Sequence, residues 1–375
     1  MMKTILVLFI TYIILSAASC EKAENQPLNK LYYVNPPVIS FQLNLVNDTI
    51  MEVPVIIIGN TAKRFIVSFI NDVDGFPRIF TPEQNSLPII MSDELGNQWD
   101  ISGIAVSGPD TGKRLKSTTS FMGYWFAWGA FFPGIEIYND DQIHNPLERV
   151  YTTGEWLIPV NEVMNGGPGK DGIPSLELPD FVSAESAEYM DPEDLILGIV
   201  MNNEVRAYPI KILDWHEIIN DSISGVHYSI TYCPLTGTGI GWSQEQNGIR
   251  STFGVSGLLY NSNLIPYDRE TDSYWSQIRL DCVQGSRKGE NIKTIQLIET
   301  TWENWKNMYP NTKVVAVNTN FDRQYNQYPY GDYRSINTTY FPANPVDTRL
   351  HSKEVVHGIV LNDHAKAYRF KDFGN

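Results

Sequence analysis

The stretch GIVMNNEVRAYPIK at 198–211 recurs 160 positions later as GIVLNDHAKAYRFK at 358–371. Each copy consists of an apolar run, a short polar stretch rich in Asn or Asp, and a second apolar run. This pattern is typical of a β-hairpin, in which a tight turn joins two strands. A repeat of this length indicates that one structural unit occurs twice in the chain.

Two further matches extend the repeat. The string NDSI at 220–223 corresponds to NDTI at 47–50, and each is followed by a run typical of a buried strand, VHYSITY or VPVIIIG. The pair Trp302 and Trp305 corresponds to Trp125 and Trp128, 177 positions earlier. An aromatic residue and a proline follow each pair, which predicts a short amphipathic helix ending at the proline.

These offsets divide the chain unevenly. One copy is complete over about 195–317, whereas the other is split, with its main part at 41–138 and its hairpin at 354–375. We therefore predict a strand-dominated α+β fold, built from an internally duplicated, pseudo-symmetric unit with two helices per copy and a circularly permuted order. In the complete copy we expect helices near 212–219 and 300–309. Because permutation requires neighbouring ends, residues near 41 and 375 should lie side by side.

Two segments lie outside the copies. The connector at 139–194 contains NGGPGKDGIP at 165–174, whose glycines and prolines exclude regular structure. Residues 318–353, here called the strap, are rich in Tyr, Asn, Pro and Arg without periodicity. Long irregular segments inside a compact domain are often functional, so the strap either covers a site or packs its tyrosines over the core.

The N-terminus is typical of an exported lipoprotein. Lys3 precedes an apolar stretch at 4–18 that suits a signal-peptide core but is short for a spanning helix. The string LSAASC at 15–20 resembles a bacterial lipoprotein processing site, in which the Cys is acylated. We predict a signal peptide at 1–19, lipidation of Cys20, a tether at 20–40 and a place on the cell envelope, facing the periplasm or the exterior. An ordinary secretory signal with a coincidental Cys is the alternative.

The composition limits the partners. The chain has 375 residues, 42% apolar and 12% aromatic, as in packed globular proteins. Asp and Glu number 43 against 28 Lys and Arg, a formal charge of −15 that repels phosphate backbones and argues against nucleic acid as a partner. Apart from Cys20, only Cys233 and Cys282 are present, too few for a disulfide scaffold but enough for one bridge.

The complete copy carries a candidate site. In the expected helix ILDWHEIIND at 212–221, His216 points inward among apolar neighbours. Alternation along the next strand puts Cys233 on the same side as His227, so we expect His216 and Cys233 to converge. Three carboxylates are available to orient the imidazole, those of Asp214, Glu217 and Asp268.

Three uses of His216 and Cys233 are open. An imidazole beside a thiol suits a transition metal such as copper or zinc, or an activated Cys nucleophile. The structural alternative is a hydrogen-bonded core His and a small buried Cys. None of the candidate side chains recurs in the other copy, which favours a functional site in the complete one. The residues that correspond to Asp214, His216 and Cys233 are Phe41, Leu43 and Asn60.

Two loops add candidate binding residues. The turn PLTGTG at 234–239 can form an anion-binding nest with Thr236 and Thr238 as donors, or can simply be a flexible turn. The strings GVSGLLY at 254–260 and YDRE at 267–270 offer Ser256 and Arg269. Arg269 either forms a structural salt bridge, for which Asp268 is available, or holds a substrate carboxylate. His227 is the remaining binding candidate.

Several long strings together resemble one known family. DGIPSLELPDFVS at 171–183, ILDWHEIINDSISGVHYSITYCPLTGTG at 212–239, TFGVSGLLYNSNLIPYDRETDSYWSQ at 252–277 and GIVLNDHAKAYRF at 358–370 are similar to bacterial and archaeal proteins catalogued as a domain of unknown function. Residues 80–138 resemble what such proteins usually carry at the C-terminal end, which agrees with a permuted order. The resemblance implies no activity. Many relatives have YCPLCGT where this chain has Thr236, so a C-x-x-C redox pair is absent here.

Three functions follow as hypotheses. The first is an extracytoplasmic enzyme or redox protein that uses His216 and Cys233, with a bound copper or zinc ion as one form. The second is a lipoprotein that binds a small molecule, such as a sugar or another organic solute, without chemistry. The third is a structural or assembly lipoprotein. Standard nucleophile-elbow, zinc-helix, phosphate-loop and dinucleotide motifs are absent from the sequence.

Overall fold

The computed structural model describes residues 42–140 and 152–374, and strands predominate in them. The α-helices there are short: α2 (Trp125–Phe131), α3 (Ile210–His216) and α4 (Trp302–Met308). Two 3₁₀ turns accompany them, η1 (Val160–Glu162) and η2 (Phe370–Phe373). The predicted strand-dominated α+β fold is confirmed.

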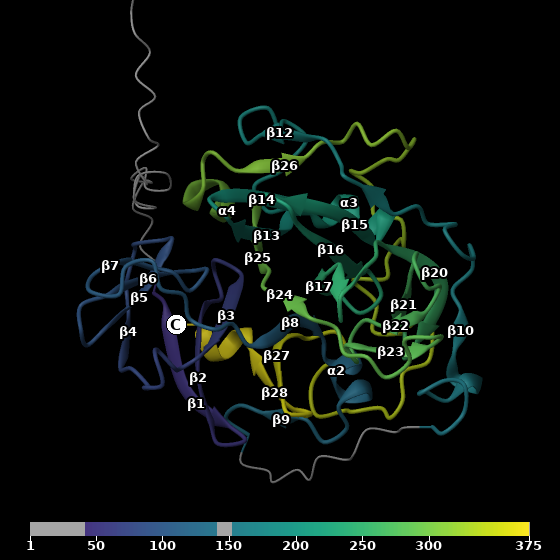
Figure 1. Ribbon diagram of the computed structural model, residues 1–375, viewed down its shortest axis with the longest axis horizontal. Helices are drawn as coiled ribbons and strands as arrows, with labels where there is room; N and C mark the ends of the chain where they lie inside the picture. Colours follow the sequence, from purple (N-terminus) through teal and green to yellow (C-terminus); the bar gives the residue numbers. More distant parts are fainter. Residues whose placement is uncertain (1–41, 141–151, 375) are drawn as a thin grey trace, which may run out of the picture.

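The second lobe, residues 195–317, is built from three five-stranded sheets to which the connector adds strands (Figure 1). The first has the order β12 (Phe181–Ser183), β26 (Lys313–Val315), β14 (Glu204–Pro209), β13 (Leu195–Met201), β25 (Ile298–Thr301). The second has the order β11 (Leu176–Glu177), β15 (Ile218–Ile223), β16 (Val226–Cys233), β17 (Thr238–Ser243), β24 (Thr294–Ile295). The third has the order β10 (Met164–Asn165), β20 (Phe253–Tyr260), β21 (Asn263–Asp268), β22 (Tyr274–Ser276), β23 (Asp281–Gln284). A separate two-stranded sheet consists of β18 (Glu245–Gln246) and β19 (Ile249–Arg250).

The first lobe comprises residues 42–138 and 354–374, at the left and centre of Figure 1. Its first sheet has the order β1 (Asn44–Ile50), β2 (Val53–Asn60), β3 (Phe65–Ile70). Its second sheet has the order β4 (Phe80–Pro82), β5 (Ile89–Asp93), β6 (Gln98–Asp100), β7 (Ala105–Ser107). Its third sheet has the order β8 (Thr119–Tyr124), β27 (Val355–Leu361), β28 (His364–Arg369), β9 (Glu136–Ile137). The C-terminal hairpin β27–β28 therefore pairs with strands that lie more than 200 residues earlier in the chain.

The two lobes share strand order and register. The strand order β8-β27-β28-β9 of the first lobe corresponds to the order β25-β13-β14-β26 of the second. The pairs β8–β27 and β25–β13 are both antiparallel, and the pairs β28–β9 and β14–β26 are both parallel. Val355 lies opposite Tyr124, and Leu195 lies opposite Thr301, which are the positions that the offsets of 160 and 177 relate. An internal duplication predicts this equivalence, since copies inherit their hydrogen-bond register.

One tryptophan in each lobe packs against a hairpin glycine. A Cβ on Gly198 would lie 2.3 Å from the Trp305 ring, and a Cβ on Gly358 would lie 2.2 Å from the Trp128 ring. Only glycine permits this approach of an indole ring to a strand. The repeated Gly and Trp of the sequence therefore meet in both lobes.

The ends of the described chain lie together. Asn44 Nδ2 donates a hydrogen bond to the Phe373 carbonyl oxygen at 2.9 Å, and Thr61 Oγ1 donates to the Phe370 carbonyl oxygen at 2.5 Å. The lobes also share buried cores: Trp128 packs in one cluster with Trp242 and Trp275. The molecule is consequently one continuous packed body.

Helix α3 ends earlier than the sequence predicted. The helix stops at His216 because Glu217 adopts a left-handed conformation, with φ of 57°. Ile219 and Asn220, which the expected helix at 212–221 included, instead lie in strand β15. The predicted range 212–219 is wrong at its C-terminal end, since periodicity alone does not reveal a left-handed cap.

Candidate functional site

Every residue of the motif Asp214–Glu217 contacts the strap. The end of α3 carries this motif, and the first contacts come from Asp214 and Trp215. Arg334 Nη2 donates to both carboxylate oxygens of Asp214, at 2.7 and 3.0 Å. Trp215 Nε1 donates to the Gln327 carbonyl oxygen at 3.0 Å. A segment without regular structure is thus held in place by specific side chains.

His216 is a structural contact of the strap. Its Nδ1 lies 2.7 Å from the Pro174 carbonyl oxygen, which can only accept, so Nδ1 carries the proton. Its Nε2 lies 2.7 Å from the Tyr325 hydroxyl, which donates to it. Burial lowers the pKa of His216 to about 4, so the ring is neutral at pH 7. Both ring nitrogens are occupied.

Glu217 is the fourth strap contact and faces a cavity. Tyr330 donates its hydroxyl hydrogen to Glu217 Oε1 at 3.0 Å. Burial raises the pKa of this carboxyl to about 7, and the nearby Asp214 carboxylate adds to the rise while the Tyr330 hydrogen bond opposes it. A carboxyl that titrates near neutral pH beside a cavity is a frequent feature of functional sites.

The cavity measures about 280 Å³ and is mainly apolar. Most of the aliphatic side chains in its wall come from the turn after β16 and from β20 and β21: Leu235, Val255, Leu258, Leu259, Leu264 and Ile265. The rest of the wall comes from Tyr330, Tyr340 and Phe341 of the strap, Gly166, Pro168 and Ile173 of the connector, Gly257 of β20, and Glu217. Both irregular segments of the sequence therefore contribute to the wall of this space.

Cys233 lies next to Glu217 but is not poised as a nucleophile. It is 1% exposed, and its thiol lies 3.6 Å from the Ser262 carbonyl oxygen. Burial, with the Glu217 carboxylate adding to it, raises the pKa of the Cys233 thiol to about 11. Nucleophilic cysteines have lowered pKa values, so the environment keeps this thiol protonated.

The structure does not join His216 and Cys233 into one site. Their ring nitrogens and sulfur have separate partners, Pro174 and Tyr325 for the imidazole and Ser262 for the thiol. Among the described residues, no group of three or more His, Cys, Asp or Glu side chains could hold a metal ion. The geometry therefore gives no support to the expected copper or zinc site. Cys233 and Cys282 are free and buried.

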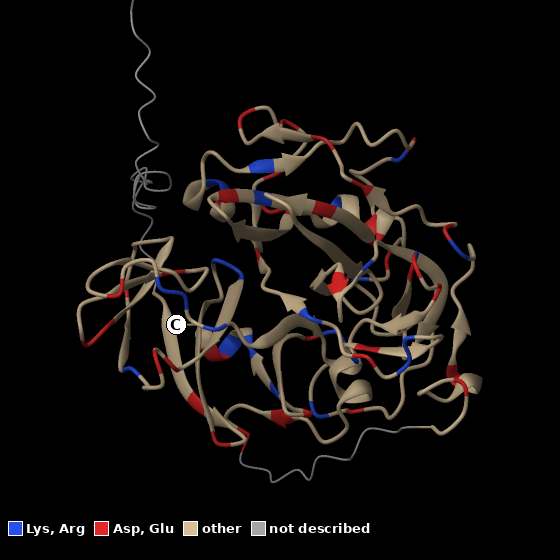
Figure 2. Ribbon diagram, viewed as in Figure 1, with Lys and Arg blue, Asp and Glu red and all other residues tan. Residues whose placement is uncertain are grey.

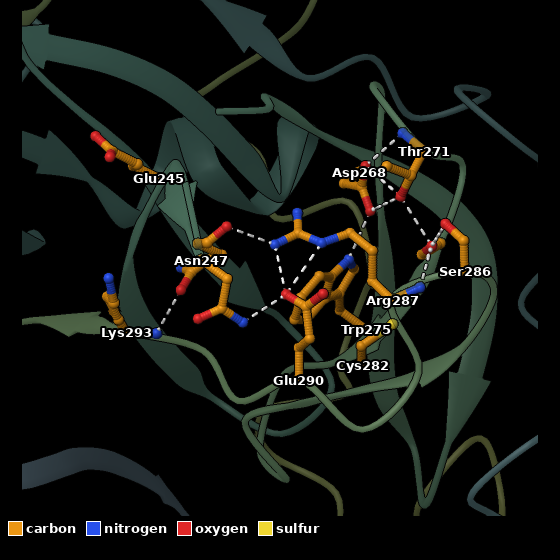
Figure 3. Close-up of polar contacts among 12 residues, drawn as sticks. Glu245, Asn247, Asp268, Thr271, Trp275, Cys282, Ser286, Arg287, Glu290 and Lys293 are labelled. Carbon is orange, nitrogen blue, oxygen red and sulfur yellow. Dashed lines mark hydrogen bonds and ion pairs between the residues drawn. The ribbon is translucent and has the colours of Figure 1, made fainter. Parts of the chain in front are cut away.

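Asp268 is part of a buried polar cluster away from the cavity lining (Figure 3). Its carboxylate accepts from Trp275 Nε1 at 2.9 Å and from the Thr271 amide at 2.7 Å. The first lobe repeats this contact, because Trp99 Nε1 donates to Asp93 at 3.1 Å. A contact present in both lobes belongs to the fold, so Asp268 orients Trp275 and not His216.

Thr236 and Thr238 are buried in a network of side-chain hydrogen bonds. Asn263 Nδ2 donates to the Thr236 hydroxyl at 3.0 Å, and Thr238 donates to Gln277 Oε1 at 2.8 Å. The Gly237 amide, in the same turn, donates to the Cys233 carbonyl oxygen. These donors are engaged within the protein, so the turn does not present them as an anion nest.

The remaining binding candidates also have structural partners. Ser256 accepts from the Leu258 amide at 3.0 Å and stabilises the bulge in β20 that shapes the cavity wall. Arg269 pairs with Asp171 at 3.0 Å and does not pair with Asp268. His227 Nε2 lies 3.2 Å from Arg250 Nη1, and His227 is absent from the cavity wall.

The sequence did not indicate that Glu217 lines a cavity. There Glu217 is expected to orient the His216 imidazole, and the strap tyrosines are not assigned to it. The available signal was the run of four polar or aromatic residues DWHE at 214–217, together with the tyrosine-rich composition of the strap. Glu217 becomes conspicuous only once its left-handed backbone turns its side chain out of the helix and into the cavity.

The fold and the cavity define a strand-rich α+β protein with a mainly apolar pocket whose wall includes parts of two irregular segments. Residues 170–374 match the model of the family described as "Protein of unknown function (DUF3179)", and the chain belongs to this family. The predicted family is thereby confirmed. No curated protein and no solved structure matches the chain.

The predicted signal peptide, Cys20 and the tether lie outside the described residues, as does the part of the connector at 141–151. In the part of the chain that the structure describes, no helix is long and apolar enough to cross a membrane. Figure 2 shows basic and acidic residues interspersed over strands and loops of that view.

Proposed function

We propose that this protein binds a small, mainly apolar organic molecule in the cavity beneath the strap. The observation that carries the proposal is the mainly apolar cavity of about 280 Å³, in whose wall Glu217 is the one carboxyl among the described residues. A cavity of this kind holds a ligand by burial of apolar surface and orients it through few polar groups. The protonated thiol of Cys233 and the engaged imidazole of His216 favour binding over thiol or metal chemistry.

A neutral fluorescent probe, N-phenyl-1-naphthylamine, tests the proposal. We expect it to bind the folded domain, expressed from residue 21, with increased emission. Leu258→Trp places an indole in the cavity wall and should abolish this signal. Leu95→Trp is the matched control, because Leu95 is 49% exposed in the first lobe, outside the cavity wall. Equal emission from both variants would contradict the proposal, provided that both melt at the parent's temperature.

We also propose that Cys20 carries a lipid that holds the protein on the cell envelope. The support is the apolar stretch at 4–18 followed by LSAASC at 15–20. Multiple acyl chains give stable membrane attachment, since each buried methylene contributes about 0.8 kcal/mol. Cys20→Ser should move the protein from the membrane fraction to the soluble one. A Cys20→Ser protein that stays in the membrane fraction would overturn the proposal.

A further inference from the structure

The charge of the cavity wall selects among possible ligands. Among the described residues that line it, Glu217 is the one carboxyl, and no Lys, Arg or His side chain is present. Glu217 is only 7% exposed, so a ligand group beside it interacts through protein and not through bulk water. An anionic ligand would meet a carboxylate without a compensating cation. The wall therefore disfavours anions.

The strap adds aromatic rings to the same wall. Tyr330, whose hydroxyl donates to Glu217, lines the cavity together with Tyr340 and Phe341. Aromatic faces attract cations through the negative potential of the ring, and the attraction grows when water is excluded. A carboxyl and aromatic rings thus face one apolar space, which is the environment that an organic cation requires.

We propose that the cavity binds a small primary or secondary amine in its protonated form, with the ammonium group on Glu217 and the apolar body against Leu258 and Leu264. This inference rests on the proposed binding function and names its ligand class. The ammonium group would donate to the Glu217 carboxylate, which also accepts from Tyr330. Charge-assisted hydrogen bonds of this type are about twice as strong as neutral ones.

Binding of an amine should depend on pH in a defined direction. Three titratable groups surround Glu217: Asp214 on α3, which pairs with Arg334; Cys233 on β16; and Tyr330 of the strap. The pKa of Glu217 is raised to about 7, so the carboxylate that attracts the amine is lost as the pH falls below 7. A primary amine remains charged throughout, as a lysine with a pKa of about 10.4 does. Affinity should therefore fall by roughly tenfold per pH unit below 7 and level off above 7.

Three probes of one shape test the inference by calorimetry: 4-phenylbutylamine, 4-phenylbutanol and 4-phenylbutyrate. At pH 8 we expect the amine to bind the parent protein most tightly. Glu217→Gln should weaken the amine by roughly tenfold or more and leave the alcohol within about twofold, because only the amine uses the charge. Glu245→Gln, a change of the same kind at an exposed position, is the control.

The outcomes separate the two proposals. If no probe binds, or if Leu258→Trp leaves binding of every probe unchanged, the binding function itself is wrong and the inference falls with it. If the alcohol or the carboxylate binds as tightly as the amine, and Glu217→Gln has no effect, the cavity binds apolar molecules but the amine class is wrong. Thermal melts of each variant exclude loss of fold as the cause.

Discussion

Glu217 should govern part of the pH dependence of stability. Its pKa is 4.5 in the unfolded reference and about 7 in the folded protein, so between these values the folded state keeps a proton that the unfolded chain has lost. Stability therefore falls as pH rises from about 5 to 7. Glu217→Gln removes this cost. At pH 8 the variant should be more stable than the parent by up to about 3 kcal/mol.

Urea unfolding at pH 5 and pH 8 measures this difference. The variant's gain should be present at pH 8 and nearly absent at pH 5. The parent curve will also contain Asp214, whose pKa burial likewise raises to about 7, so only the difference between variant and parent reports Glu217. A variant less stable than the parent at pH 8 would show that the carboxylate is better compensated than its burial indicates.

Cys233 and Cys282 should resist thiol reagents in the folded protein. Burial raises the pKa of Cys233 to about 11 and that of Cys282 to about 12, and reaction requires an exposed thiolate. With Cys20 removed, iodoacetamide at pH 7.5 should label neither residue in hours, and both within minutes in denaturant. Rapid labelling of folded Cys233 would restore the hypothesis of a reactive thiol.

At the scale of elements, the strap depends on the end of α3. Arg334 contacts Asp214 and lies 4.0 Å over the Tyr328 ring, so it fixes the middle of the strap. Arg334→Met leaves the Asp214 carboxylate, which is 4% exposed, without its cation. We expect a loss of about 2 to 4 kcal/mol in unfolding free energy and faster proteolysis within 318–353.

Arg323→Met is the matched control for Arg334→Met, since Arg323 belongs to the same strap and stacks over Trp215 at 5.7 Å. It should cost much less. Similar proteolysis of both variants would mean that the Asp214 contact does not hold the strap.

The sequence predicted those regular elements whose signals are local or repeated. The hairpins and the paired tryptophan helices follow from strings that occur twice, and β16 spans the run that alternation indicated. The site could not be obtained in this way. Part of its wall comes from the connector and the strap, which lack periodicity, and Glu217 itself has the left-handed backbone conformation that ends α3.

For the whole molecule, the sequence offsets of 160 and 177 correspond to equivalent positions in the two lobes. Strands related by the offsets take the same places in equivalent sheets, and the first lobe obtains its central hairpin from the end of the chain. Circular permutation of a duplicated unit would produce this arrangement, because the hairpin precedes the other strands in the second lobe and follows them in the first. The duplication remains a prediction that chain rearrangement can test.

A permuted chain should fold if the lobes are equivalent in this way. We would join Gly374 to Gln42 through about six Gly and Ser residues and open the chain between Thr153 and Gly154. The join is short because Asn44 contacts Phe373, and Gly154 is exposed with no atoms near its Cβ position. The hairpin 355–369 would then directly precede the first lobe, as β13–β14 precede the second. We expect the melting temperature to stay within about 5 °C of the parent.

A second permutant, with the same join but opened between Tyr228 and Ser229 in the middle of β16, separates tolerance of the join from tolerance of any break. This opening divides a buried strand that pairs on both sides with β15 and β17, so it should not fold. If the first permutant also fails to fold, the ends of the chain cannot be joined in the way that β14 is joined to the following strands in the second lobe. If it folds and binds the same probes as the parent, the first lobe is a complete unit. Its hairpin then lies at the end of the chain only because of the order in which the strands are connected, and the packing does not depend on that order.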